Sequence, residues 1–149
     1  MENMVDSGRV KSIGISNCNV GQLRELIRGA RIKPEYVQKR CFANTGWEKE
    51  MRELCKAHGI IFQGYSILTA NRYLNKDHKM LNIAKRHGKT VQQIIFRFAL
   101  QMGMTPLTGS SSQLHLDEDL SVYDSFELSA KEIAVIEHAG IGKGKRRGH

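Results

Sequence analysis

The stretch GRVKSIGISN, residues 8–17, decides the fold because it has the pattern of a buried β-strand that ends in small polar residues. Val10, Ile13 and Ile15 form an apolar run suited to burial on both faces, as in a parallel sheet. We therefore predict a strand over residues 10–15. Polar residues at the end of such a strand are typical of an active site, yet only nine residues precede this strand.

Further strands and capped helices alternate along the rest of the chain. Apolar runs predict strands over residues 36–38, 60–65 and 104–108. Helices are predicted after the caps Asn19 and Thr90, over residues 79–87, from near Ser112, and after the capping boxes Thr45/Glu48 and Ser129/Glu132. These elements make four β-then-α units, which implies parallel strands joined by crossover helices. Periodicity leaves two architectures open, a small doubly wound sheet or part of a (β/α)8 barrel.

Length and hydropathy indicate one globular domain. The chain has 149 residues, of which 40% are hydrophobic, enough for one core. Its longest apolar runs are only a few residues, and its first residues lack the apolar segment of a secretory signal. We therefore expect no membrane association and a cytoplasmic location.

The three cysteines, Cys18, Cys41 and Cys55, form no CxxC pair. A metal site would need closer spacing together with histidines. We expect free, at least half-buried thiols and no metal ligands.

The positive charge is concentrated at the C-terminus. Of the formal net charge of +8, four charges come from Lys143, Lys145, Arg146 and Arg147 in the glycine-rich segment GIGKGKRRGH, residues 140–149. We predict a basic, flexible tail over this segment. RNA or another acidic surface as its partner is the least favoured of the functions considered, because the remaining charge forms no stripe.

Four motifs, in order and spacing, resemble the aldo-keto reductase family. They are SIGISN at residues 12–17, HGIIFQGYS at 58–66, GKTVQQIIFRFALQMG at 88–103, and PLTGSSS at 106–112 followed by EDL at 118–120. The resemblance extends from about residue 8 to residue 139 and implies an α/β fold, a partial (half) TIM (β/α)8 barrel with four parallel strands and crossover helices. Residues 1–139 would form units five to eight, with SIGISN as the fifth barrel strand and the first half missing.

The resemblance also implies a cofactor, usually NADPH, with NADH possible. Ser16 and Asn17 match the residues that hydrogen-bond the nicotinamide carboxamide, Gln38 lies at a strand end that serves the same group, and the Tyr65 ring would stack on the nicotinamide. Ser66 and Leu68 follow that strand and complete this part of the predicted site. The alternatives are that Asn17 caps the next helix and that Tyr65 is a core aromatic residue.

The phosphate end of the predicted site departs from the family pattern. Gly109, Ser110 and Ser111 lead into a helix N-terminus, which favours an anion. However, Gly109 replaces the family's common lysine and His115 replaces its phosphate-binding arginine. Imidazole is mostly uncharged near neutral pH, so the grip on a 2′-phosphate is expected to be weak. Glu118 and Asp119 match the adenine-binding positions, with Asp119 in place of an asparagine.

No residue of this chain matches the family's catalytic tyrosine, lysine, aspartate and histidine, which belong to the first half of the barrel. We therefore assign no catalytic residue and expect a truncated oxidoreductase that is inactive alone. One hypothesis is that a complementary N-terminal half-barrel restores reduction of a small carbonyl substrate. The other is a non-catalytic module that binds nucleotide or self-associates through open sheet edges, at residues 10–15 and 104–108.

Overall fold

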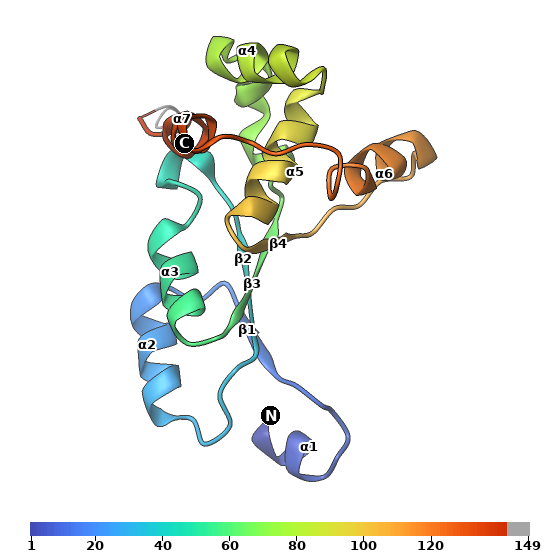
Figure 1. Cartoon of the computed structure of the whole chain (residues 1–149). Helices are drawn as coiled ribbons and strands as arrows, with labels where there is room; N and C mark the ends of the chain where they lie inside the picture. Colours follow the sequence, from blue (N-terminus) through green and yellow to red (C-terminus); the bar gives the residue numbers. More distant parts are fainter. Residues whose placement is uncertain (143–149) are drawn as a thin grey trace, which may run out of the picture.

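A computed structural model describes residues 1–142 of the chain and shows one parallel sheet. Its strands are β1 (Gly14–Ser16), β2 (Tyr36–Arg40), β3 (Ile61–Tyr65) and β4 (Met104–Pro106). They are hydrogen-bonded in the order β1-β2-β3-β4, and every pair is parallel (Figure 1). The prediction of four parallel strands joined by helices is therefore confirmed.

One short helix precedes β1, and the other helices lie between or after the strands. The helices are α1 (Glu2–Asp6), α2 (Val20–Gly29), α3 (Lys49–Ala57), α4 (His78–His87), α5 (Val91–Gln101), α6 (Gln113–Leu120) and α7 (Ala130–His138), with 3-10 turns η1 (Ala43–Thr45) and η2 (Thr69–Lys76). The predicted caps Asn19, Thr90 and Ser129 each receive a hydrogen bond from the backbone three residues on. Local capping chemistry thus fixes where α2, α5 and α7 begin.

The predicted capping box at Thr45 and Glu48 is wrong. The Thr45 hydroxyl donates to the Phe42 carbonyl at 2.9 Å and also contacts the Glu48 carboxylate at 2.7 Å, so it closes the η1 turn. Glu48 has φ 56°, outside the helical region, and α3 begins at Lys49. The Thr45/Glu48 pattern therefore belongs to a 3-10 turn, which is followed by a residue in the left-handed conformation. Trp47 lies before helix α3 and not within it.

The first strand is shorter and less buried than predicted. Only residues 14–16 pair with β2, and Gly14 and Ser16 are exposed, so burial on both faces is wrong for this strand. Within the described residues β1 pairs on one side only, which leaves no second neighbour to extend it. At the other edge, β4 ends at Pro106, two residues earlier than predicted.

The two faces of the sheet differ in polarity. Cross-strand pairing aligns Ile15, Val37, Phe62 and Met104 in one row, and these apolar side chains pack toward the helices. The next row, Ser16, Gln38, Gln63 and Thr105, lies on the opposite face and is exposed or half-buried. Figure 1 shows α2 and α3 together along one side of the strands. Parallel sheets are usually covered on both faces, so a polar face at this position indicates a site or a missing cover.

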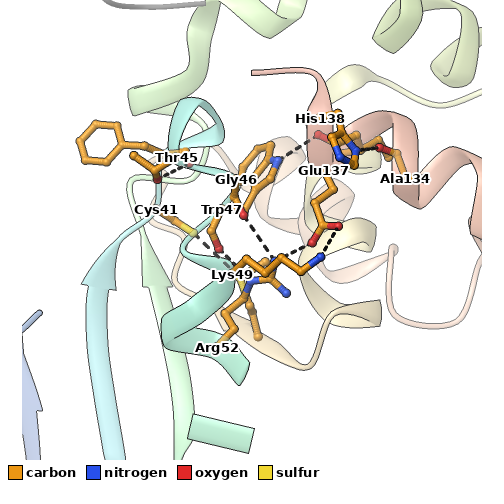
Figure 2. A network of polar contacts seen from close by, with 12 residues as sticks. Cys41, Thr45, Gly46, Trp47, Lys49, Arg52, Ala134, Glu137 and His138 are labelled. Carbon is orange, nitrogen blue, oxygen red and sulfur yellow. Dashed lines mark hydrogen bonds and ion pairs between the residues drawn. The ribbon is translucent and has the colours of Figure 1, made fainter. Parts of the chain in front are cut away.

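Trp47 connects the core beside the sheet to α7, near the end of the described chain. Its ring is fully buried, lies 5.3 Å from the Phe98 ring, and donates from Nε1 to the Ile136 carbonyl at 3.0 Å. Nearby, Arg52 pairs with Glu137 at 3.0 Å (Figure 2). These contacts hold α7 against α3 and η1.

The three cysteines are free and buried, as predicted. Burial raises the pKa of the Cys41 thiol to about 12 and that of Cys55 to about 11, which makes both unreactive near neutral pH. Within residues 1–142, no group of three His, Cys, Asp or Glu side chains is placed to hold a metal ion.

No helix within residues 1–142 is both long and apolar enough to cross a membrane. The basic residues of the predicted C-terminal tail lie at positions 143–149, outside the described residues. Ahead of them, Gly140 lies directly against the Ala43 backbone.

Candidate cofactor-binding site

The predicted nicotinamide-binding residues meet where β1 and β3 end, beside the middle of β2. The prediction that β2 ends at Gln38 is wrong, because the strand continues to Arg40, where it still pairs with Tyr65 of β3. The Tyr65 hydroxyl donates to the Asn17 side-chain oxygen at 2.9 Å, and the Asn17 backbone N–H donates to the Gln38 carbonyl at 2.9 Å. Ser16 and Gln38 also line a shallow hollow of about 310 Å³ on the polar face of the sheet. The ends of β1 and β3 therefore converge beside the middle of β2.

The backbone at this point is held in an uncommon conformation. Asn17 has φ 56° and Ser66 has φ 55°, and each directly follows a strand, β1 and β3 respectively. A left-handed conformation costs a non-glycine residue about 1 kcal/mol, and such residues are concentrated at functional sites. The two turns therefore support assignment of this strand edge as a site.

The structure excludes helix capping by Asn17 and a place in the hydrophobic core for Tyr65. The helix cap is Asn19, so the Asn17 side chain is free of capping and accepts from the Tyr65 hydroxyl. Tyr65 is half-buried and lies outside the hydrophobic core cluster. Its ring is therefore available on the polar side of the strand end.

A second, larger groove of about 710 Å³ lies past β4 and beside η2. Six predicted cofactor-binding residues line it: Leu68, Gly109, Ser110, His115, Glu118 and Asp119. They come from two segments about forty residues apart in sequence, and the fold brings them together. Four predicted residues line neither groove: Asn17, Tyr65, Ser66 and Ser111.

Hydrogen bonds shape the loop between β4 and α6. Ser110 accepts from the Ser112 backbone N–H at 3.1 Å, and Thr108 donates from its hydroxyl to the Asp119 carboxylate at 2.7 Å. Ser112 is the N-cap of α6 and makes no side-chain capping bond. The start of α6 therefore faces the loop with donors that a side chain does not satisfy.

Sequence reasoning missed part of the larger groove. Its further lining residues are Thr69, Arg72, Asn75, Thr90, Gln92 and Thr108. Three of these lie on η2, in a connection that carries no recognisable cofactor motif. The sequence carries no signal for Arg72, because it stands 37 positions before Gly109 and only the fold brings the two residues to the same groove.

Two tyrosines, Tyr36 and Tyr73, have phenol pKa values shifted away from neutrality. Burial raises the pKa of Tyr73, and a hydrogen bond with Glu35 raises that of Tyr36. An acid-base phenol needs the opposite shift. Tyr36 and Tyr73 therefore lack the tuning of an acid-base phenol.

Comparison with characterised proteins identifies relatives along nearly the whole chain. It is 32% identical to the glyoxal reductase of Bacillus subtilis (strain 168) over 99% of this chain and 52% of that protein. It is 33% identical to aldose reductase B of Dictyostelium discoideum over 89% of this chain and 42% of that protein. The chain thus spans about half the length of the curated relatives that it matches.

Solved structures give the same result for the fold. The aldose reductase from Schistosoma japonicum matches with a TM-score of 0.86 and 31% identity, over 97% of this chain and 46% of that one. An aldo/keto reductase from Brucella melitensis matches with a TM-score of 0.79 and 28% identity, over 91% and 51%. The predicted partial TIM barrel is therefore confirmed. The sequence model of the aldo/keto reductase family matches residues 1–141, and the chain belongs to this family.

Proposed function

We propose that this chain is the cofactor-binding half of an oxidoreductase that transfers hydride between NADP(H) and a carbonyl or alcohol. One observation carries the proposal: residues suited to both ends of a dinucleotide lie along the carboxyl edge of one parallel sheet. Asn17 and Tyr65 form one end, and the groove at Gly109 and Ser110 forms the other. Ligands of open and closed parallel α/β folds bind at this edge.

Each residue would have a defined task in that site. Ser16, Asn17 and Gln38 present polar groups to the carboxamide, while the Tyr65 ring offers a flat apolar surface to the nicotinamide. Asn17 accepts from the Tyr65 hydroxyl and so fixes the orientation of the ring. When bound, the nicotinamide supplies the hydride. NADPH is the proposed cofactor, and NADH is the alternative because Gly109 and His115 replace the family's charged residues.

Reduction of a carbonyl also needs a proton, and we propose that an N-terminal half-barrel supplies the donor. The exposed row that includes Ser16 and Thr105, and the open edges at β1 and β4, are the surfaces that such a half would cover. The matched barrels are about twice the length of this chain, which supports a partner of similar size. A small carbonyl compound would be the substrate of the completed barrel only.

The open edges also support a second candidate, a self-associating or nucleotide-binding module without catalysis. Unpaired strands pair readily with another chain. Light scattering over a concentration series separates the two candidates: dimers formed by the chain alone favour self-association, and a persistent monomer counts against it.

Titration with NADPH, followed by nicotinamide fluorescence, tests the proposed site. Loss of one aromatic stacking partner is worth about 0.5–1.5 kcal/mol, so Tyr65→Ala should weaken binding roughly two- to tenfold. Tyr123→Ala is the matched control, because Tyr123 is 52% exposed and lies after α6 instead of at a strand end. Equal affinities for the two variants would remove the assignment of Tyr65, and no response at millimolar NADPH would remove the nicotinamide end of the site.

A further inference from the structure

The larger groove contains one permanently cationic side chain, that of Arg72. Among the described residues that line this groove, the other ionisable groups are His115, Glu118 and Asp119. His115 carries no permanent charge, and the two carboxylates repel an anion. Among the described side chains that line this groove, Arg72 is therefore the one that attracts a phosphate electrostatically.

The backbone that carries Arg72 is firmly anchored. Its neighbour Asn71 is 1% exposed and has a non-helical φ of −125° inside η2. The Asn71 amide accepts from the Ala43 N–H at 2.8 Å and donates to the carbonyls of Cys41 at 2.9 Å and Ile67 at 2.7 Å. This network ties η2 to the end of β2, so that Arg72 is presented from a fixed point beside the groove.

The Arg72 guanidinium is also available for a ligand. It is exposed, and it makes no ion pair or hydrogen bond within the described part of the chain. Other arginines of the chain are engaged: Arg31 pairs with Asp6, and Arg97 pairs with Glu127. A charged fork without an acidic partner, on an anchored segment, is suited to an incoming phosphate.

We propose that Arg72 binds a phosphate group of the dinucleotide, together with the Ser110 hydroxyl that lines the same groove. The proposal rests on the proposed function and deepens it. Arg72 supplies the positive charge that the glycine at position 109 and the histidine at position 115 lack. It comes from the segment after β3 instead of from the loop after β4, so the cation reaches the groove from its other wall.

Two nucleotides without a nicotinamide ring test this proposal on the intact chain. ADP carries the diphosphate, and adenosine 2′,5′-bisphosphate carries the 2′-phosphate. Calorimetric titration at low salt should show that Arg72→Gln weakens binding of at least one of them roughly tenfold. A hydrogen bond to a charged group contributes a free energy of about that size. Arg72→Lys, which keeps the charge but loses the fork, should lose less.

The control is Arg28→Gln, which removes the same charge from the exposed face of α2, outside the groove, and should leave both affinities unchanged. A loss confined to the bisphosphate assigns Arg72 to the 2′-phosphate, and a loss for ADP assigns it to the diphosphate. Unchanged affinities in Arg72→Gln, or no binding of either nucleotide by the unmodified chain, overturn the proposal. Failure of the nicotinamide titration alone would overturn the Tyr65 end and leave Arg72 supported.

Discussion

Arg52→Ala should be strongly destabilising, because the Arg52 side chain joins α3 to α7. Arg52 is 9% exposed; its Nε donates to the Trp47 carbonyl at 2.7 Å, and its terminal nitrogen donates to the Glu137 carboxylate at 3.0 Å (Figure 2). Truncation removes both bonds and leaves Glu137, which is 15% exposed, with only the Lys49 ammonium at 3.3 Å.

The magnitude follows from that geometry. Removing one partner of a buried ion pair costs about 3–5 kcal/mol. Because Lys49 still neutralises part of the Glu137 charge, we expect the lower end, about 3 kcal/mol in the free energy of unfolding. The loss of the bond to the Trp47 carbonyl is included in this figure.

Urea unfolding followed by the fluorescence of Trp47, the single tryptophan, measures this change. Arg24→Ala is the control, since Arg24 and Glu50 form an exposed pair at 3.5 Å whose loss should cost under about 1 kcal/mol. If Arg52→Ala costs no more than Arg24→Ala, the reasoning about the buried network is refuted.

Three further predictions concern the same region of the core. Gly140→Ala places a Cβ 2.3 Å from the Ala43 carbonyl carbon and should lower the midpoint of thermal unfolding by several degrees; an unchanged midpoint would show that the segment after α7 does not pack there. The Cys41 thiol, with its pKa raised by burial, should react with a thiol reagent such as DTNB only after urea is added, and rapid labelling of the folded chain would contradict its burial. Burial tends to raise the pKa of Glu137, but its hydrogen bonds with Arg52 and Lys49 outweigh this and place it below 4.5. The pairing therefore stabilises the fold above pH 4.5, and this stabilisation is lost as the pH falls through the lowered pKa. In Arg52→Ala, the free energy of unfolding should fall less steeply as the pH decreases. An identical slope in the variant and the unmodified chain would exclude the pairing.

The parts of the fold that depend on local chemistry could be predicted from the sequence. Three helices begin at the caps that the sequence predicts. In each, the cap side chain accepts a hydrogen bond from the backbone N–H three residues later, at Asn19, Thr90 and Ser129. Where the same local pattern serves two structures, prediction failed: Thr45 and Glu48 fit a capping box, yet they close a 3-10 turn before a left-handed residue.

The site was predictable only where a motif carried it. Asn17 and Tyr65 belong to recognisable strand ends, and the contact between them agrees with their predicted role. Arg72 could not be placed from the sequence, because its position depends on Asn71 bonding to residues about thirty positions earlier. Non-local hydrogen bonds of this kind leave no periodic pattern.

Chemical-shift mapping of NADPH on the ¹⁵N-labelled chain tests most directly whether one sheet edge seats both ends of the dinucleotide. The account predicts that the backbone amides of Asn17 and Tyr65 and those of Ser110 and Asp119 shift together, with one dissociation constant. Shifts confined to one of the two ends, or none at millimolar NADPH, would contradict it.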